Sequence, residues 1–307
     1  MRITALAGGT GAAKLLRGLA ACLPPDDLTV VGNTGDDTEV WGLHVSPDLD
    51  TVTYALGGVL DVARGWGRAE ETFHCRDVMA TLGATAWFSL GDRDLAVHLT
   101  RTAALRAGQS LSAVTARLAA AFGVRARLLP MSDQPVRTSV VTTEGRRAFQ
   151  EYFVRDRAQG DVVRVEYEGA EAARPAPGVR EAIAGADLVV VCPSNPVTSI
   201  GPMLAVAGIA EALASTRARV VGVSPIVGGA PVSGPAGRLM HARGLEVSPL
   251  GVATAYAPWL RALLIDEQDR AVADALAARG VHAVVTDVMM PDRAREVALA
   301  RRVLEAQ

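Results

Sequence analysis

Several features that mark common protein classes are scarce in this 307-residue sequence. Its three cysteines are odd in number and far apart, which excludes a disulfide framework and a paired-cysteine metal motif, and we expect a reducing, cytoplasmic setting. The 31 basic and 33 acidic side chains leave a net charge of −2, so there is no basic surplus for nucleic acid or an anionic membrane surface. No apolar run reaches the ~20 residues of a membrane span. Met1 through Thr4 lead straight into a strand-like run, unlike a signal peptide.

Lysine is almost absent: Lys14 is the single lysine, and all other basic residues are arginine. It lies in the most glycine-rich segment near the N-terminus. A compact ammonium group suits phosphate oxygens, where the planar fork of arginine is less interchangeable. The lysine therefore marks a phosphate contact, or it is simply the one lysine that a base composition favouring arginine has left.

Half of the residues are apolar, and short apolar runs alternate with stretches of helical periodicity. This alternation predicts an α/β protein with a mainly parallel sheet in a Rossmann-like, three-layer arrangement. The expected strands are residues 3–7, 28–31, 187–191, 219–223, 262–265 and 281–285. The expected helices are one that ends at Leu19 and residues 51–63, 76–82, 95–106, 111–122, 200–213, 235–242, 268–278 and 293–304.

A middle region, residues 124–178, differs from the rest. β-branched residues alternate over 138–143, a turn is expected at Glu144-Gly145, and strand-like stretches follow at 149–154 and 162–167. We interpret this region as a small α+β insertion, antiparallel in part, that ends in a linker rich in proline and glycine. The parts on either side of it, residues 1–123 and 179–307, are expected to form one α/β domain.

The first expected strand runs into a glycine-rich loop, Gly8 to Lys14. In open α/β sheets ligands bind at the carboxyl ends of the strands, and glycines followed by a helix N-terminus favour a phosphate there. The loop is not a Walker motif, because Leu15 rather than serine or threonine follows Lys14. It also departs from the dinucleotide fingerprint, whose third small residue is replaced by Lys14. A tight strand-to-helix turn without a ligand is the alternative interpretation.

Aspartates cluster after the second expected strand, where five fall within 26 residues. The set consists of Asp36 and Asp37, which follow the strand directly, and of Asp48, Asp50 and Asp61. Asp48 and Asp61 suit caps or turns, and Asp50 or Thr51 would cap the helix expected there. Carboxylates beside a phosphate loop repel one another, and Mg²⁺ removes that repulsion by binding one or two carboxylates together with phosphate oxygens and water. We therefore predict that part of the set is a metal site.

Three further loops carry polar residues at the ends of strands or starts of helices. In residues 89–94, Asp92 and Asp94 are good helix starters, and a capped helix start is the alternative to a ligand contact. In residues 192–199, serine and asparagine offer paired donors and acceptors to a base or sugar. In residues 224–237, glycines and prolines make a long rigid loop of the kind that usually has a function. The five histidines show no metal-ligand spacing, and we expect them in packing or surface positions.

In their order along the chain, these motifs resemble the 2-phospho-L-lactate transferase family of coenzyme F-420 biosynthesis. The motifs are Gly8 to Gly11, Asn33 to Asp37, Pro47 to Thr51, Leu90 to Asp94, Pro130 to Asp133, Pro193 to Pro196, Ser199 to Pro202 and Ser224 to Gly237. The resemblance implies that the donor is a guanosine diphosphate ester of lactate or enolpyruvate. The implied acceptor is the ribityl 5′-hydroxyl of the deazaflavin Fo, which displaces GMP. Relatives also suggest a homodimer.

The resemblance implies a role for particular residues. Asp36 and Asp50 would hold Mg²⁺ and act in catalysis, and Asp50 also matches a position that contacts Fo. Ser89 lies where several relatives carry lysine. The full set of expected substrate contacts is Gly8, Gly9, Thr10, Gly11, Lys14, Asn33, Asp50, Ser89, Ser194, Asn195, Gly228 and Gly229. On this basis Asp50→Ala is predicted to abolish turnover and to leave the fold intact.

Two alternatives to the transferase remain at the level of sequence. A sister group of nucleotide-sugar-binding proteins, linked to cell-wall and carbon regulation, shares the glycine loop. Residues 47–51, 90–94 and 224–237 favour the transferase over that group. A nicotinamide oxidoreductase is the second alternative, and the missing third small residue of the glycine fingerprint counts against it.

Overall fold

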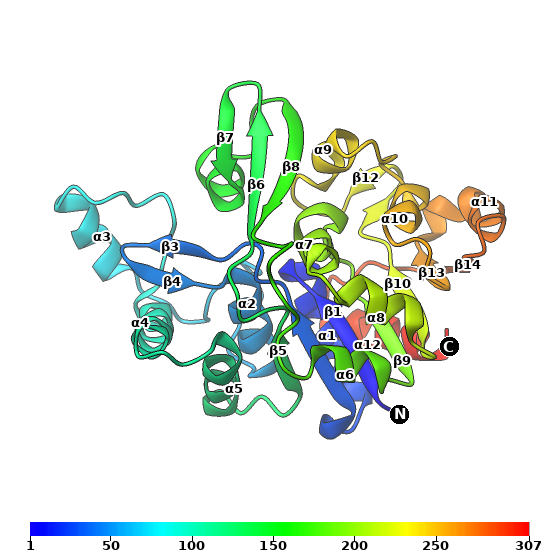
Figure 1. Cartoon of the computed structure of the whole chain (residues 1–307), viewed down its shortest axis with the longest axis horizontal. Coiled ribbons are helices and arrows are strands. Elements are labelled where there is room, and N and C mark those ends of the chain that lie inside the picture. The colour runs from blue at the N-terminus through cyan, green and yellow to red at the C-terminus, as the bar shows by residue number, and fades with distance from the viewer. Residues whose placement is uncertain (307) are drawn as a thin grey trace.

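The computed structural model describes residues 1–306, and a seven-stranded sheet forms its centre (Figure 1). The strand order is β14-β13-β10-β9-β1-β2-β5, and every neighbouring pair is parallel. The strands are β1 (Ile3–Ala7), β2 (Leu28–Gly32), β5 (Arg127–Pro130), β9 (Leu188–Val191), β10 (Arg219–Val223), β13 (Ala262–Ile265) and β14 (His282–Val285). The predicted Rossmann-like α/β fold is confirmed.

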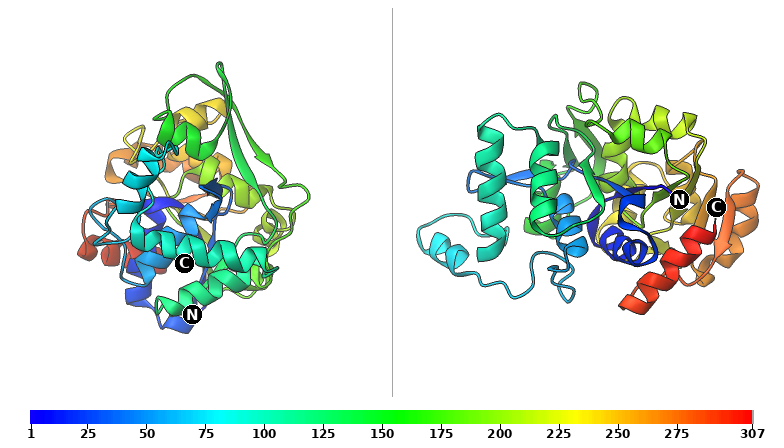
Figure 2. Two further views of the ribbon diagram at one scale, coloured as in Figure 1. Left: turned by 90° about the vertical axis from the view of Figure 1, so that its left-hand side faces the viewer. Right: turned by 90° about the horizontal axis from the view of Figure 1, so that it is seen from below.

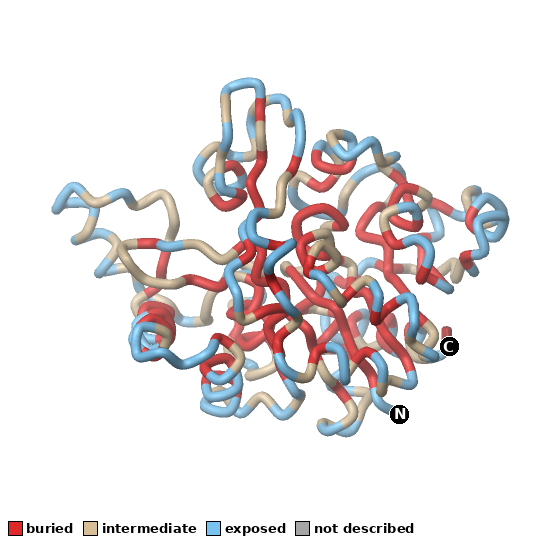
Figure 3. Tube along the Cα trace, in the orientation of Figure 1, coloured by how far each residue is buried: buried red, intermediate tan, exposed pale blue. Residues whose placement is uncertain are grey.

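Both faces of the sheet are apolar and covered by helices, as a parallel sheet requires. Alternate residues point to opposite faces, so Leu6 and Val31 join one core while Ala5 and Val30 join the other. The second core is covered by α1 (Gly9–Cys22), α2 (Pro47–Leu56), α5 (Leu111–Ala121) and α12 (Arg293–Glu305). The first is covered by α6 (Val179–Ala184), α8 (Ile209–Ser215), α9 (Ala236–Ala242) and α10 (Pro249–Ala255). Figure 2 shows these layers from below, and Figure 3 shows the burial of the strands between them.

The helix expected at 51–63 begins four residues earlier in the chain and ends sooner. α2 starts at Pro47, a residue favoured in the first turn because its missing N–H is not needed there. It ends at Leu56, and Gly58 with φ +73° turns the chain away. The prediction that Asp50 or Thr51 caps this helix is therefore wrong, because both lie inside it.

Two other expected helices are broken. The stretch 200–213 is divided among three segments: the end of a π-helical turn, Pro196–Ile200, then α7 (Gly201–Ala205), then α8. A left-handed Gly208 with φ +105° separates α7 from α8. Residues 268–278 divide into a 3₁₀ segment, Glu267–Val272, and α11 (Ala273–Ala277). Hydrophobic periodicity detects the buried face of such a segment and not the local change in its winding.

The antiparallel insertion is a three-stranded sheet of order β7-β6-β8 that projects from the main body (Figure 1). Its strands are β6 (Arg137–Thr142), β7 (Gly145–Ala148) and β8 (Val162–Glu168). The strand-like stretch at 149–154 is instead helical and leads into a π-helical turn, Glu151–Arg155. Phe149, just before this turn, stacks on Phe153 with centroids 5.6 Å apart. A four-residue spacing brings side chains together on a helical turn and not on a strand. The middle region 124–178 also begins with β5, which belongs to the main sheet.

Near residues 89–94, the side chain that caps each of two helices comes from just before or within the other helix. The Asp92 carboxylate accepts hydrogen bonds from the backbone N–H of His74 and Cys75, both at 3.0 Å, at the start of α3 (His74–Thr81). The Glu71 carboxylate in turn accepts from the N–H of Arg93 and of Asp94, both at 2.8 Å, at the start of α4 (Asp92–Arg106). Because α3 has no buried residue, these caps are a main attachment of α3 to the rest of the protein. The capped helix start is thus present, with Asp92 capping the other helix.

Gly91→Ala is expected to lower the free energy of unfolding by roughly 1 kcal/mol, the usual worth of a helix cap. A Cβ at Gly91 would lie 2.3 Å from the Glu71 carboxyl carbon, so Glu71 must withdraw from the N-terminus of α4. Urea unfolding measures the loss. In a Glu71→Ala background the same substitution should cost almost nothing, and an equal loss in both backgrounds would contradict this explanation.

Within residues 1–306, no single helix is long and apolar enough to cross a membrane. The helices Pro196–Ala205 and Ile209–Ser215 reach that length and composition only as a pair bent by 88°. Apolar side chains of this pair, including Val197, Ile200 and Ile209, belong to the buried core.

Candidate active site

The loops that carry the sequence motifs lie along one edge of the sheet. Several of them follow β1, β2, β5, β9 and β10, and parallel strands place all their carboxyl ends on the same side. The chain runs outward from β1 in both directions, to β2 and β5 on one side and to β9, β10 and β13 on the other. This reversal of strand order is the point at which open α/β sheets bind ligands.

The glycine loop after β1 is packed against two neighbouring segments. A Cβ at Gly8 would lie 2.6 Å from Asp48 Oδ2 and 2.6 Å from Ser199 Cβ, and a Cβ at Gly11 would lie 2.4 Å from the Pro193 carbonyl oxygen. The Gly8 N–H donates to Ser194 Oγ at 3.2 Å. Glycine is therefore needed here for close packing of α2 and the β9 loop, and this packing brings predicted site residues together.

Asp48 joins the glycine loop to the aspartates after β2. Its Oδ1 accepts from the Gly9 N–H at 2.7 Å, and its Oδ2 accepts from Asn33 Nδ2 at 2.9 Å. Burial raises the pKa of Asp48 to about 6. Burial also raises the pKa of Asp36 well above its ordinary value, and the neighbouring Asp48 charge adds to that rise. The two buried carboxylates therefore repel each other, and only Asp48 has hydrogen bonds to both of its oxygens.

Asp36 and Asp48 fit a divalent cation. One carboxylate oxygen of Asp36, Oδ1, is buried and has no hydrogen-bond partner in residues 1–306. Hard oxygen ligands with uncompensated charge are what Mg²⁺ prefers. That part of the chain holds no group of three or more histidine, cysteine, aspartate or glutamate side chains arranged for a metal, so further ligands would be water and phosphate oxygens, as is usual for Mg²⁺.

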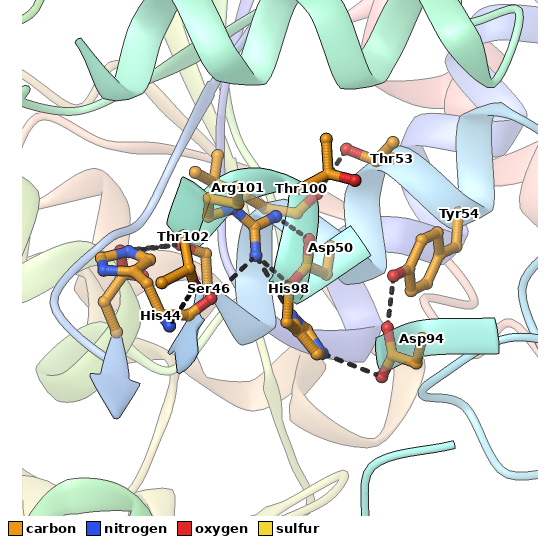
Figure 4. Close-up of polar contacts among 12 residues, drawn as sticks. His44, Ser46, Asp50, Thr53, Tyr54, Asp94, His98, Thr100, Arg101 and Thr102 are labelled. Carbon is orange, nitrogen blue, oxygen red and sulfur yellow. Dashed lines mark hydrogen bonds and ion pairs between the residues drawn. The ribbon is translucent and has the colours of Figure 1, made fainter. Parts of the chain in front are cut away.

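Asp50 faces away from this pair. Successive helical residues are rotated by about 100°, so Asp48 and Asp50 project from nearly opposite sides of α2. Both oxygens of Asp50 accept from the Arg101 guanidinium of α4, Oδ2 from Nη1 at 3.0 Å and Oδ1 from Nη2 (Figure 4). The structure therefore brings Asp36 together with Asp48, and Asp50 together with Arg101. The Mg²⁺ site itself stays a prediction.

Five buried side chains, Asp50, Tyr54, Asp94, His98 and Arg101, form what we call the Arg101 network. His98 Nδ1 lies 3.3 Å from Arg101 Nη1, and His98 Nε2 lies 3.3 Å from Asp94 Oδ2. The Tyr54 hydroxyl donates to the other oxygen of Asp94. Neither His98 nor Arg101 stands out in the sequence by itself. Their spacing is the feature by which the sequence could have identified them, because residues 94, 98 and 101 share one face of a helix and are polar where that face is buried.

Comparison with known proteins identifies the family of this chain. The family model described as 2-phospho-L-lactate transferase CofD matches residues 3–305. The chain belongs to this transferase family. A phosphoenolpyruvate transferase of Streptomyces griseus is 48% identical over 311 residues, which cover 99% of this chain and 98% of the relative. A 2-phospho-L-lactate transferase of Methanosarcina mazei is 44% identical over 299 residues, which cover 97% of this chain and 98% of the relative.

The fold extends beyond this transferase family. A crystal structure of a UPF0052 family protein from Bacillus halodurans superimposes with a TM-score of 0.69 over 99% of this chain and 98% of its own, at 18% sequence identity. At that identity the likeness shows a shared fold, and the confirmed three-layer arrangement is the one it shares.

Several of the remaining residues predicted to contact substrate have hydrogen-bond partners within this transferase family member. Lys14 Nζ donates to the Met290 carbonyl at 3.0 Å. The Asn195 side-chain oxygen accepts from the N–H of Val197 and Thr198. Ser89 Oγ accepts from Arg76 Nη1 at 3.4 Å. The Gly228 N–H donates to both oxygens of Asp269, each at 3.1 Å, while Gly9 and Thr10 are partly exposed. Their predicted substrate contacts stay predictions, and Lys14 and Asn195 already have partners within the protein.

Proposed function

We propose that this protein transfers a phospholactyl or phosphoenolpyruvyl group from its guanosine diphosphate ester to the 5′-hydroxyl of the deazaflavin Fo, with release of GMP, in coenzyme F-420 biosynthesis. Membership of the transferase family supports the reaction class. The observation that carries the proposal is the pair Asp36 and Asp48, buried next to the glycine loop where the strand order reverses.

The diphosphate of the donor would lie against the first turn of α1. The Gly9 N–H of that turn already donates to Asp48, and the N–H groups that follow it have no partner within the helix, so they would bind an anion. Asp36 and Asp48 would hold Mg²⁺ beside it, and the ion would supply neutralisation of the diphosphate and of the leaving GMP. The guanosine would extend over β9 and β10, toward Ser194 and the Gly228–Gly229 turn.

The acceptor would lie beside the first turns of α2, next to Asp50, with its hydroxyl within reach of the donor phosphorus. The Arg101 contact fixes the Asp50 carboxylate in place, and this carboxylate would accept a hydrogen bond from the acceptor hydroxyl and orient it toward the phosphorus. Phosphoryl-type transfer needs positioning and charge neutralisation more than a covalent nucleophile, which suits a site without one. The homodimer implied by the family resemblance stays a prediction.

Removal of divalent metal is expected to stop transfer, and added Mg²⁺ is expected to restore it, because Asp36 and Asp48 cannot neutralise a diphosphate by themselves. The test incubates the protein with Fo, Mg²⁺ and the lactyl or enolpyruvyl donor and measures product mass, with and without excess chelator. Full transfer in chelator would contradict the metal role.

The same assay tests the proposed function as a whole. The product masses identify the donor acid, and the fluorescence of Fo reports acceptor binding. A protein that makes no product from any donor and binds UDP-sugars tightly, without binding Fo, would instead be a regulator of the sister group.

A further inference from the structure

We propose that Arg101 is a positioning residue for the acceptor: it holds the Asp50 carboxylate in a single orientation, and His98 and Asp94 hold Arg101. This inference rests on the proposed function, because it assigns Asp50 to the acceptor side of the reaction. It goes further by giving Asp48 and Asp50, two residues apart on α2, separate roles and separate supporting contacts.

The contact between Arg101 and Asp50 fixes the orientation of the carboxylate as well as its position. Two parallel N–H···O contacts define the plane of the carboxylate, which a single contact leaves free to rotate. The exposed fractions of the two residues are only 2% and 5%, so water does not compete for these bonds. Arg101 Nη1 also lies 3.5 Å from the His44 carbonyl oxygen on β4 (Leu43–Val45).

Hydrogen-bond chemistry sets the direction of the rest of the network. A guanidinium only donates, so His98 Nδ1 must accept from Arg101 Nη1, and the ring proton therefore sits on Nε2. That Nε2 faces Asp94 Oδ2, whose partner oxygen accepts from the Tyr54 hydroxyl (Figure 4). His98 thus accepts from the guanidinium, and its Nε2 lies 3.3 Å from Asp94 Oδ2 without a hydrogen bond of good geometry.

The network joins α2 to α4 through two side-chain contacts. Asp50 and Tyr54 lie one turn apart on α2, and their partners Arg101 and Asp94 lie on one face of α4. Burial lowers the pKa of Arg101, but the adjacent Asp50 carboxylate outweighs that effect and holds the pKa above its ordinary value. Burial raises the pKa of Asp94, yet its contacts with His98, Tyr54 and Arg101 together hold it below its ordinary value.

The metal half of the site has separate supports. Asp48 accepts hydrogen bonds from Gly9 and Asn33, whereas Asp50 accepts its two from Arg101. Loss of Arg101 should consequently disturb the acceptor and leave the donor and the cation nearly unaffected. A buried ion pair with a purely structural role would show no such selectivity.

The experiment compares Arg101→Gln and Arg101→Lys with Arg17→Gln as a matched control. Arg17 forms an ion pair with the buried Glu296 between α1 and α12, outside the site. For each variant, kcat and KM are measured with Fo varied and with the donor varied, together with the Mg²⁺ concentration that gives half-maximal rate. Urea unfolding shows how far each variant is destabilised.

We expect Arg101→Gln to lower kcat/KM for Fo by about 10²-fold, as misplacement of a reacting group does. The donor KM and the Mg²⁺ requirement should change by less than about twofold. Arg101→Lys should recover only part of the loss, because it keeps the charge and not the two parallel bonds. Arg17→Gln should lose stability without a selective change for Fo.

A second pair of variants covers the case in which Arg101→Gln does not fold. His98→Gln keeps an acceptor for Arg101 and should stay near wild type, whereas His98→Leu should lower kcat/KM for Fo by about tenfold. Equal losses for Fo, donor and Mg²⁺, or unchanged Fo kinetics in the Arg101 and His98→Leu variants, would overturn the inference. A wild-type protein without transfer to Fo would overturn the proposed function instead.

Discussion

Asp36→Asn is expected to abolish Mg²⁺ binding and to lower the transfer rate by about 10³-fold, while it makes the metal-free protein more stable. Asparagine has no charge for a cation, and Asp36 has no hydrogen bond to lose at its buried Oδ1. The gain in stability follows from the pKa of Asp36, which burial and the Asp48 charge raise above that of the unfolded chain.

The sign of this effect gives a pH dependence. A carboxyl with a raised pKa in the folded state favours folding at low pH, and this contribution is lost as the pH rises above the pKa of the unfolded chain, near 4. The stability gain of Asp36→Asn should therefore be larger at about pH 8 than at about pH 5. Urea unfolding in chelator and calorimetric titration with Mg²⁺ measure the two effects.

The exposed Asp26 supplies the control for this prediction. Asp26→Asn removes the same charge from the surface and should change neither Mg²⁺ affinity nor transfer. If Asp36→Asn kept wild-type Mg²⁺ affinity, or became less stable in chelator, the two buried carboxylates would not be the cation ligands.

Asp50→Ala is expected to lower the free energy of unfolding by about 3–5 kcal/mol, because it leaves the Arg101 guanidinium buried without a partner. The buried ion pair thus adds a cost in stability to the loss of turnover that the sequence predicts. Loss of turnover in Asp50→Ala would therefore combine a loosened contact between α2 and α4 with the loss of the acceptor contact. Urea unfolding separates the two contributions.

A double substitution makes the separation sharper. Asp50→Leu with Arg101→Met removes both charges and fills the space with apolar atoms, which is often neutral or stabilising for a buried pair. We expect it to recover most of the stability lost in Asp50→Ala and none of the transfer. Recovery of transfer would show that Asp50 has no part in the reaction, and failure to recover stability would show that the unpaired guanidinium is not the cause.

Local patterns predicted the elements best where one rule dominated. The buried strand 188–191 and the amphipathic helix 293–305 are found at nearly their expected bounds, because apolar periodicity alone determines them. The Phe149–Phe153 segment was misread as a strand because its apolar residues suit either period, and only the stacking of the two rings in the folded chain selects the turn.

The helix caps near residues 89–94 also depend on contacts that the local sequence pattern does not determine. The sequence correctly indicated a capped helix start, since aspartate and glutamate favour that position. It gave no sign that Asp92 caps α3 while Glu71 caps α4, because a carboxylate reaches whichever N–H groups the packing of the two helices brings near it.

The amino-acid sequence by itself determined the Rossmann-like order of elements, the glycine loop and the group of aspartates at the edge of the sheet, because strand alternation and the residues that follow each strand are local properties. Only the tertiary structure decided which aspartates meet. The helix that begins at Pro47 turns Asp48 toward Asp36 and Asp50 toward Arg101, and a shift of one or two residues in that start would exchange their directions. Contacts between distant segments depend on how helices pack and rotate, and no pattern along a single chain contains that information.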